Sequence, residues 1–298
     1  MSLEAPEPAE APVVRTIPRR SVALGLIVLA IILVGALIVV RHIDQSNATS
    51  DVETITLAPT SLVTTLAQVP VSASNAVGVT SPADPTTAPT ATGNAALWES
   101  STAGGRARPV VFFYGAEFAP YAAAERWPVI VALSRFGTFG QLGLMQSSSS
   151  VAFSNTSTFT FWRATYSSKW VDLQTNERYS SLDPTGAGYT TLETPTARQS
   201  ASVAIYDTSA QTFPLLDIAN HYVLLGSSFS PTVLSGLSQA QIANDLAYPA
   251  NPVTQAILAS ANEITAAICS VTGQSPARVC TTHGVIEAST KMKIDTAG

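Results

Sequence analysis

The stretch from Pro109 to Trp127 reads PVVFFYGAEFAPYAAAERW, and the architecture is expected to form around it. Pro109 to Tyr114 is a continuous apolar run, which is typical of a strand buried on both faces. Gly115 ends the run, and Ala119-Pro120 begins a helical stretch to about Phe136, because proline is favoured in the first helical turn. A buried strand that leads directly into a helix predicts an α/β fold.

Aromatic and β-branched residues predict further strands downstream. Residues 159–173, FTFWRATYSSKWVDL, favour a strand or a hairpin. Phe213-Pro214 precedes two apolar runs in LLDIANHYVLLG, and the step at residues 219–221 is typical of the turn of a hairpin. Ala201 to Tyr206 is compatible with either a strand or a helix.

The C-terminal part predicts helices with recognisable ends. Ser238 and Gln241 form an S-x-x-Q capping box for a helix over about residues 239–247. Asn251 is expected to cap a longer helix with Pro252 at its first position, and Gly273 to end it. Together with the strands, these helices predict a central mixed sheet flanked by helices.

The composition argues against several classes of protein. The 298 residues suffice for one large domain or two small ones, but only 12% of them are charged. A formal net charge of −5 argues against nucleic-acid binding. Two cysteines and three histidines leave little material for a zinc cluster, so no metal site and no cofactor is predicted.

Residues 21–40 read SVALGLIVLAIILVGALIVV, an uncharged run of the length that crosses a bilayer. A cleaved signal peptide has a shorter apolar core and a small-residue cleavage site, whereas Arg41 follows this run at once. We therefore expect a transmembrane helix over residues 21–41, in preference to a cleaved signal or a buried core helix. This helix would make the membrane itself a partner of the chain.

The charges that flank this run predict its orientation. Arg15, Arg19 and Arg20 precede it, and after Arg41 no Lys or Arg occurs until Arg106. The positive-inside rule then places a tail of residues 1–20 in the cytoplasm and the main domain outside, in the cell membrane as a single-pass protein. We expect a polar stalk over residues 42–56, a domain over 57–298, a short packed helix within 57–79, and a flexible Thr/Pro-rich loop at 80–94.

Several stretches carry a resemblance to a known family. They are YGAEFAPYAAAERW (114–127), RFGTFGQLGLMQSSS (135–149), TFTFWRATYSSKW (158–170), FPLLD (213–217) and ICSVTGQSPARVC (268–280). Over about residues 57–285 the chain resembles a prokaryotic membrane-anchored thioredoxin-like family described as domain of unknown function 929. The resemblance implies a thioredoxin-like fold, with an active-site segment that opens a helix and a cis-proline at Pro214 facing it.

The chain departs from this family at the expected catalytic motif. Cys-Pro-aromatic-Cys is typical of the family, whereas this chain has Ala119-Pro120-Tyr121-Ala122. In an active site of this type, the helix N-terminus stabilises the thiolate of the first cysteine, and the second resolves the mixed disulfide. Alanine provides no nucleophile, so no catalytic residue is predicted here. The chain is either an inactive relative or one in which both cysteines were replaced by design.

The residues around the motif suggest a binding groove. We expect it to be lined by Glu117, Tyr121, Trp127, Pro214 and Asp217. Glu117 and Glu125 form a possible acid–base pair, but a solvated turn with an exposed helical glutamate is the simpler interpretation. Asp217 has either a role in tuning thiol chemistry or a structural, hydrogen-bonded role, and the absence of thiols favours the second.

The two cysteines lie elsewhere, at Cys269 and Cys280. A structural disulfide is the expected state outside the membrane, and two alternatives are a redox-active pair and two free thiols. Their spacing is much wider than the two-residue gap of the common redox motif.

Three functions are compatible with these observations. The first is a non-catalytic, extracytoplasmic module whose groove binds a peptide or a protein partner through strand-like backbone contacts. The second is a thiol–disulfide oxidoreductase that acts through Cys269 and Cys280, which requires an accessible, low-pKa thiol. The third is a structural component of the cell envelope that needs no groove.

Overall fold

Strand β4 (Arg108–Gly115) lies at the centre of the main sheet, and its residues from Val110 to Tyr114 are at most 2% exposed. The computed structural model describes residues 55–100, 106–182 and 188–295. Strand β7 (Asp172–Glu177) pairs with β4 in parallel, and β8 (Leu215–Ile218) pairs with it antiparallel. Burial on both faces explains the unbroken apolar run of β4, as predicted.

Three further strands complete this mixed sheet. Strand β9 (Tyr222–Leu225) pairs with β8, β2 (Thr90–Ala91) pairs with β9, and β3 (Glu99–Ser100) pairs with β4. Ala219 and Asn220 have positive φ angles of 54° and 64°, as expected for the primed turns that join tight hairpins. The predicted β8–β9 hairpin is therefore confirmed.

A second, three-stranded sheet has the order β1-β5-β6. Strands β5 (Gly137–Gln146) and β6 (Ser157–Ser168) form a long antiparallel hairpin, and β1 (Thr56–Leu57) pairs with β5. This hairpin lies in the chain between α4 (Pro120–Ser134) and β7. The sequence 159–173 thus contributes to two strands, β6 and β7, that belong to different sheets.

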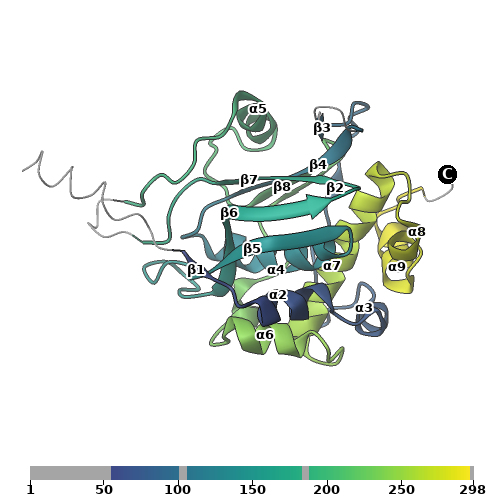
Figure 1. Ribbon diagram of the computed structural model, residues 1–298, viewed down its shortest axis with the longest axis horizontal. Helices are drawn as coiled ribbons and strands as arrows, with labels where there is room; N and C mark the ends of the chain where they lie inside the picture. The colour runs from purple at the N-terminus through teal and green to yellow at the C-terminus, as the bar shows by residue number, and fades with distance from the viewer. Residues whose placement is uncertain (1–54, 101–105, 183–187, 296–298) are drawn as a thin grey trace, which may run out of the picture. The chain divides into compact units, whose positions relative to one another are not determined.

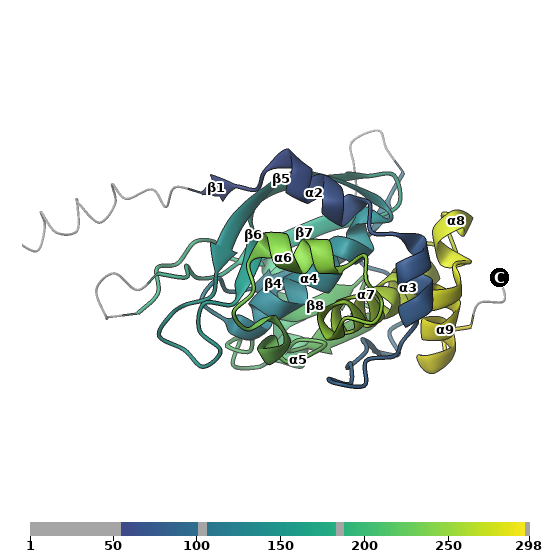
Figure 2. The ribbon, with the colours of Figure 1, turned by 90° about the horizontal axis from the view of Figure 1, so that it is seen from below.

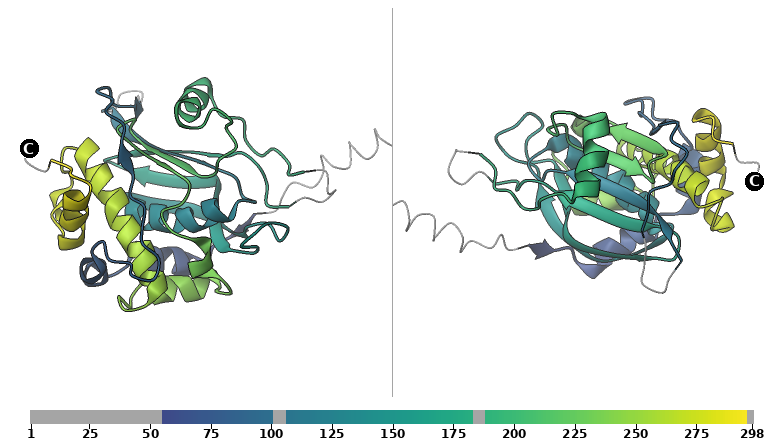
Figure 3. Two further views of the ribbon diagram at one scale, coloured as in Figure 1. Left: turned by 180° about the vertical axis from the view of Figure 1, so that it is seen from behind. Right: turned by 90° about the horizontal axis from the view of Figure 1, so that it is seen from above.

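Helices cover both faces of the main sheet (Figure 1). Helices α4 and α7 (Pro252–Val271) lie on one side, and α5 (Ala197–Tyr206) lies on the other, as Figure 3 also shows from behind and from above. The prediction of an α/β fold with a mixed sheet between helices is confirmed. The segment that was compatible with a strand or a helix, Ala201 to Tyr206, belongs to helix α5.

Short helices surround this core, and Figure 2 shows several of them from below. They are α2 (Thr60–Ala67), α3 (Val71–Val77), the 3₁₀ helix η1 (Pro231–Leu234), α6 (Gln239–Asp245), α8 (Ala277–Cys280) and α9 (His283–Lys291). The segment expected to hold one short helix, 57–79, therefore holds two, because Pro70 separates α2 from α3.

The predicted helix ends are confirmed where the signal was local. Ser238 and Gln241 form the reciprocal capping box of α6. Asn251 Oδ1 accepts a hydrogen bond from the Val253 N–H at 2.9 Å, with Pro252 in the first position of α7. Gly273 has a φ of +60° just after α7, a conformation that favours glycine.

The segment 80–94 differs from the flexible loop that its composition predicts. The Thr87 N–H donates to the Ser228 carbonyl at 2.8 Å, and Asp84 accepts from the Ser230 N–H at 2.6 Å. Thr86 donates to Glu263 at 3.1 Å, and β2 adds to the edge of the main sheet. Contacts with distant residues thus fix this segment to the domain, which its Thr/Pro content alone does not indicate.

Within residues 55–100, 106–182 and 188–295, no helix has both the length and the apolar character needed to cross a membrane. The predicted transmembrane helix over residues 21–41, the cytoplasmic tail and nearly all of the stalk lie outside the described residues.

Candidate functional site

The degenerate motif occupies the start of helix α4, directly after the central strand. Ala119 is the N-cap residue and Pro120 follows it inside the first turn, whereas the cap has no side-chain hydrogen bond. Ala119 and Ala122 are 6% and 0% exposed, but Tyr121 is 44% exposed. The motif therefore presents one aromatic side chain to solvent and no polar side chain that could react.

The bond between Phe213 and Pro214 is cis, as the resemblance implied. Strand register pairs Tyr114 with Leu215, so Pro214 lies beside the end of β4 from which the motif continues. The Phe213 ring packs edge-on against Phe118 at a centroid distance of 5.8 Å, and Phe118 directly precedes Ala119. The structure thus places the cis-proline next to the motif.

Two tyrosines pack around this junction. The Tyr189 ring stacks on Phe118 at 4.2 Å, and Tyr179 meets Phe213 edge-on at 6.1 Å. The backbone N–H and C=O of Phe213 make no hydrogen bond to any of the described residues. Phe213 itself is only 7% exposed, and the neighbouring Pro214 carbonyl accepts a hydrogen bond from the Gly226 N–H at 2.8 Å.

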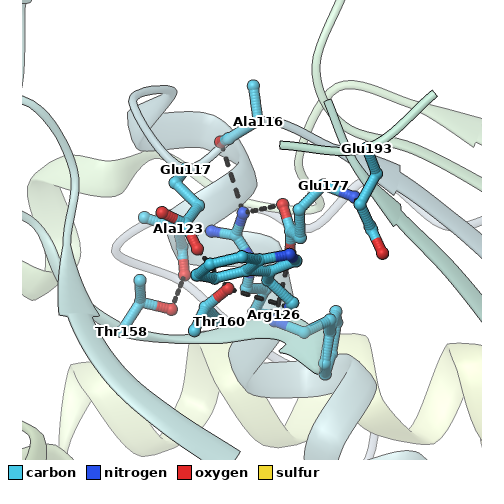
Figure 4. A network of polar contacts seen from close by, with 10 residues as sticks. Ala116, Glu117, Ala123, Arg126, Thr158, Thr160, Glu177 and Glu193 are labelled. Carbon is cyan, nitrogen blue, oxygen red and sulfur yellow. Dashed lines mark hydrogen bonds and ion pairs between the residues drawn. The ribbon is translucent and has the colours of Figure 1, made fainter. Parts of the chain in front are cut away.

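A buried ion pair lies beneath the motif (Figure 4). Arg126, in the second turn of α4, donates from Nε and Nη2 to the two carboxylate oxygens of Glu177 at 2.9 and 2.7 Å. Nη2 also donates to the Ala116 carbonyl at 3.2 Å, and both side chains of the pair are 0% exposed. This pair joins α4, the turn before the motif and the end of β7.

Glu117 belongs to the same network and is only 3% exposed. Its carboxylate accepts a hydrogen bond from the Thr160 hydroxyl on β6, and its N–H donates to the Tyr179 carbonyl at 2.8 Å. The interpretation of Glu117 as part of a solvated acidic turn is therefore wrong. Its neighbour in sequence, Phe118, is the residue of this turn that remains partly exposed.

Glu125 is also fully buried, so its interpretation as an exposed helical residue is wrong too. Its carboxylate accepts from the Ser228 N–H at 2.6 Å and from the Ser228 hydroxyl at 3.0 Å. Burial raises the pKa of Glu125 to about 8, against the opposing effect of these two hydrogen bonds. Glu125 and Glu117 contact different partners, which does not support an acid–base pair.

Trp127 and Asp217 do not line an accessible groove. Trp127 is 0% exposed and donates from Nε1 to the Ser157 carbonyl at 3.0 Å, so it is a core residue. Asp217 is also 0% exposed and accepts from the Ser202 hydroxyl at 2.5 Å and the Asn220 N–H at 2.6 Å. Burial raises its pKa, and its contacts fit the structural role that was favoured. Of the five expected groove residues, only Tyr121 is exposed, and Pro214 is buried beside the motif.

A cleft next to the motif was not predicted. Its volume is about 670 Å³, and hydroxyl and amide side chains from Gln146, the run Ser147–Ser150, Asn155 and Gln239 contribute to its lining. The Ser148 N–H donates to the Phe118 carbonyl at 3.1 Å, which ties this wall to the motif. We call this feature the serine cleft. The run QSSSS after a strand was its only local signal in the sequence.

The predicted disulfide between Cys269 and Cys280 is confirmed. The two residues are 0% and 4% exposed, and they connect α7 to α8. Among the described residues, no group of three or more His, Cys, Asp or Glu side chains is arranged to hold a metal ion.

Comparison with known proteins gives one match. Residues 103–181 match the family described as Domain of unknown function (DUF929). The matched segment contains β4, the Ala119–Ala122 motif, α4 and strands β5 to β7, whereas Pro214 and both cysteines lie beyond it. The match supports the resemblance to this domain family over residues 103–181. Neither a curated protein nor a solved structure matched the chain.

Proposed function

We propose that this chain is a membrane-anchored, extracytoplasmic domain of the thioredoxin-like type that lacks redox cysteines and binds an extended polypeptide. The observation that carries the proposal is the cis Phe213–Pro214 bond, whose phenylalanine packs on Phe118 immediately before Ala119. In the proposed site, a cis-proline and two packed phenylalanines therefore lie beside two alanines in place of two cysteines.

The order of elements supports the thioredoxin-like assignment. Strand β4, helix α4 and the parallel strand β7 form a β-α-β unit, and the motif occupies its first strand-to-helix junction. In such a unit, this junction is where a Cys-x-x-Cys motif is expected. The hairpin of β8 and β9 then returns antiparallel beside β4 and begins with the cis-proline.

The absence of sulfur at the motif removes the redox chemistry. A thiolate at the N-terminus of α4 would accept hydrogen bonds from the first-turn N–H groups and gain from the helix dipole. The methyl groups of Ala119 and Ala122 can neither attack a disulfide nor resolve one. What remains is a junction with an exposed aromatic side chain, Tyr121, and at Phe213 a backbone that makes no hydrogen bond to the other described residues.

An extended polypeptide is the ligand that these groups suit. The N–H and C=O of Phe213 offer the pairing that β-augmentation uses, in which backbone hydrogen bonds give affinity. Tyr121 packs edge-on against Phe153 at 5.8 Å, and the two half-exposed rings offer an apolar contact for a side chain. Aromatic residues at such positions often dominate binding energy.

The alternative enzyme, acting through Cys269 and Cys280, has less support. A reactive cysteine must be accessible and must be present as a thiolate. These two residues are joined to each other and are 0% and 4% exposed. A structural disulfide at the end of α7 accounts for them without redox function.

Two assays on the full chain in lipid nanodiscs test the proposal. The first is reduction of insulin disulfides by dithiothreitol, in which the chain is expected to give no turnover above the uncatalysed rate. Turnover would contradict a non-catalytic role. A separate measurement tests the anchor and its orientation. The chain should remain in the nanodiscs, and protease added to intact vesicles should digest the domain in right-side-out vesicles and leave it intact in inverted ones.

The second assay measures binding of fluorescein-labelled, carboxymethylated insulin B chain, an extended polypeptide without reactive thiols. Tyr121→Ala is expected to weaken binding about ten-fold, since truncating an aromatic contact commonly costs more than 1 kcal/mol. Ile205→Ala is the matched control, because Ile205 is 62% exposed and lies on α5. No binding by the unmodified chain, or equal loss in both variants, would favour a purely structural role.

A further inference from the structure

The serine cleft lies beside the exposed ring of Tyr121. The loop between β5 and β6 forms part of its lining, and the Ser148 N–H in this loop donates to the Phe118 carbonyl at 3.1 Å. The Ser147 hydroxyl donates to the Phe153 carbonyl at 3.4 Å, and the Phe153 ring packs edge-on against Tyr121 at 5.8 Å. One loop therefore lines the cleft and holds the ring that contacts Tyr121.

The cleft offers hydrogen-bonding groups without charge. No charged residue lines it in the described part of the chain, whereas a second cavity, at the start of β4, is lined in part by Arg106 and Lys169. The Ser149 hydroxyl and the Asn155 amide belong to exposed residues and have no hydrogen-bond partner among the described residues. Leu144 adds apolar surface. The volume of about 670 Å³ is of the size that ligand pockets have.

We infer that the serine cleft receives one uncharged, polar side chain of the bound polypeptide and excludes charged ones. The inference rests on the proposed function, in which the polypeptide contacts Tyr121, and it adds a sequence preference to that function. The amide of a glutamine both donates and accepts hydrogen bonds, as do the hydroxyl and amide groups of the lining. Its methylene groups can pack on Leu144 and Met145.

The exclusion of other side chains follows from what they would lose in the cleft. A charged side chain would give up part of its hydration without gaining a counter-charge. An aliphatic side chain would displace water from the lining hydroxyl and amide groups and leave them without a partner. Glutamine and asparagine lose least, because they replace the displaced water with hydrogen bonds.

Competition by short peptides on the full chain in lipid nanodiscs tests this preference. The competitors are acetylated and amidated nonapeptides, Ala-Thr-Ala-Thr-X-Thr-Ala-Thr-Ala, in which X is glutamine, glutamate, lysine or leucine. The threonines favour an extended chain, and the blocked ends leave X as the only charge. Each peptide displaces the labelled, carboxymethylated insulin B chain. The glutamine peptide is expected to bind at least about ten-fold more tightly than the glutamate and lysine peptides, and more tightly than the leucine peptide.

Variants of the lining should change the preference in a defined direction. Gln146→Glu places a carboxylate in the cleft, so the lysine peptide should now bind more tightly than the glutamine peptide, and the glutamate peptide more weakly than before. Ser149→Asp should do the same from an exposed position without a hydrogen-bond partner among the described residues, which guards against a folding defect at Gln146.

Gln141→Glu is the matched control. Gln141 is exposed and lies on the same strand, β5, but it does not line the cleft. Five residues of strand separate it from Gln146, roughly 15 Å, which exceeds the screening length of about 8–10 Å at moderate salt. The order of the four peptides should be that of the unmodified chain.

Equal binding of the four peptides, tighter binding of the leucine peptide, or the same change of order in all three variants would overturn the inference. Each of these results leaves the proposed function standing as long as the labelled B chain binds and Tyr121→Ala weakens it. Failure of the B chain to bind the unmodified chain would contradict the proposed function, and this inference with it.

Discussion

The first and second turns of helix α4 differ sharply in how their side chains are used. In the first turn, the side chains of Ala119 and Ala122 are small and apolar, and the N-cap has no side-chain hydrogen bond. In the second turn, Glu125, Arg126 and Trp127 are fully buried, and each has a polar partner in a distant part of the chain. The first turn thus has no side chain that makes a polar contact with the other described residues, whereas the side chains of the second turn fix the helix to the rest of the domain.

This difference follows from what each turn contributes to stability. A buried charge that loses its partner costs several kcal/mol, so the second turn tolerates little change. A cysteine at the start of a helix contributes chemistry and only modestly to folding. The fold can therefore persist without the motif, and substitutions in the two turns should have effects of different size and kind.

Arg126→Met should produce the largest effect. It leaves the carboxylate of Glu177, which is 0% exposed, without its cation. We expect the free energy of unfolding of the full chain to fall by about 3–5 kcal/mol, measured by urea unfolding in detergent.

Two comparison variants sharpen this prediction. The double variant Arg126→Met with Glu177→Leu removes both charges and should recover most of the loss. Arg108→Met breaks a pair with Asp172 whose side chains are 24% and 29% exposed, together with a hydrogen bond to the Ser168 carbonyl, so it should cost about 1–2 kcal/mol. If Arg126→Met proved no worse than Arg108→Met, the second turn would not be the structural part of the helix.

Glu125→Gln should alter the dependence of stability on pH. Burial raises the pKa of Glu125 in the folded state to about 8, above its ordinary value of 4.5. Between these pH values the folded state binds more protons than the unfolded state. The stabilisation that protonated Glu125 gives the folded state is therefore complete below pH 4.5 and is lost as the pH rises towards 8. The slope from this group is at most about 1.4 kcal/mol per pH unit.

The glutamine variant keeps both hydrogen bonds to Ser228, because its carbonyl can accept from the N–H and its amide can donate to the hydroxyl. We expect it to match the unmodified chain near pH 5 and to exceed it in stability near pH 8, in thermal unfolding at a series of pH values. Glu99→Gln changes an exposed acid and should leave the profile as it was. A profile unchanged by Glu125→Gln would show that this residue is already ionised in the folded state.

Local signals made much of the fold predictable. The capping box at Ser238 and Gln241, the Asn251 cap and the hairpin turn near Asn220 each depend on residues within a few positions of one another. The cis bond before Pro214 and the disulfide followed instead from the family resemblance and from the context expected outside a membrane. For each of these features, the sequence contains the interacting groups in one short segment or in a recognisable motif.

Contacts between distant residues could not be predicted in the same way. Arg126 and Glu177 are 51 positions apart, and the sequence around either residue does not indicate its partner. Helix α4 is buried on nearly all sides from Ala122 to Leu133, so its apolar periodicity does not indicate which face carries Glu125. The hydrogen bonds that fix the segment 80–94 to Ser228 and Ser230 likewise depend on the completed sheet.

Ala119→Cys combined with Ala122→Cys should create a working redox motif in the first turn of α4. The two positions are separated by Pro120 and Tyr121 at a helix start, which suits a disulfide whose Cα atoms lie about 4.4–6.8 Å apart. The chain-entropy relation gives about 2 kcal/mol of stabilisation for so small a loop, and the helix N-terminus should bring the first thiol pKa below about 8.5. Mass spectrometry after thiol alkylation should show an internal disulfide, and insulin reduction should become measurable. New thiols that never pair would show that the motif does not have thioredoxin-like geometry.

Ala119→Ser should have the smallest effect, and it isolates the capping role of this position from its redox role. Ala119 has the N-cap backbone angles φ −80° and ψ 120°, so a serine hydroxyl there can accept a hydrogen bond from an N–H of the first turn. We expect a gain of about 1 kcal/mol in thermal unfolding, without any reductase activity. Ala122→Ser is the matched control, because this residue is 0% exposed and inside the helix, where a hydroxyl loses its hydration and has no capping role. That variant should lose about 1 kcal/mol. If both serines lowered stability equally, position 119 would have no room for a side chain larger than alanine. A thiolate that caps the helix, as the proposed site requires, could then not fit there.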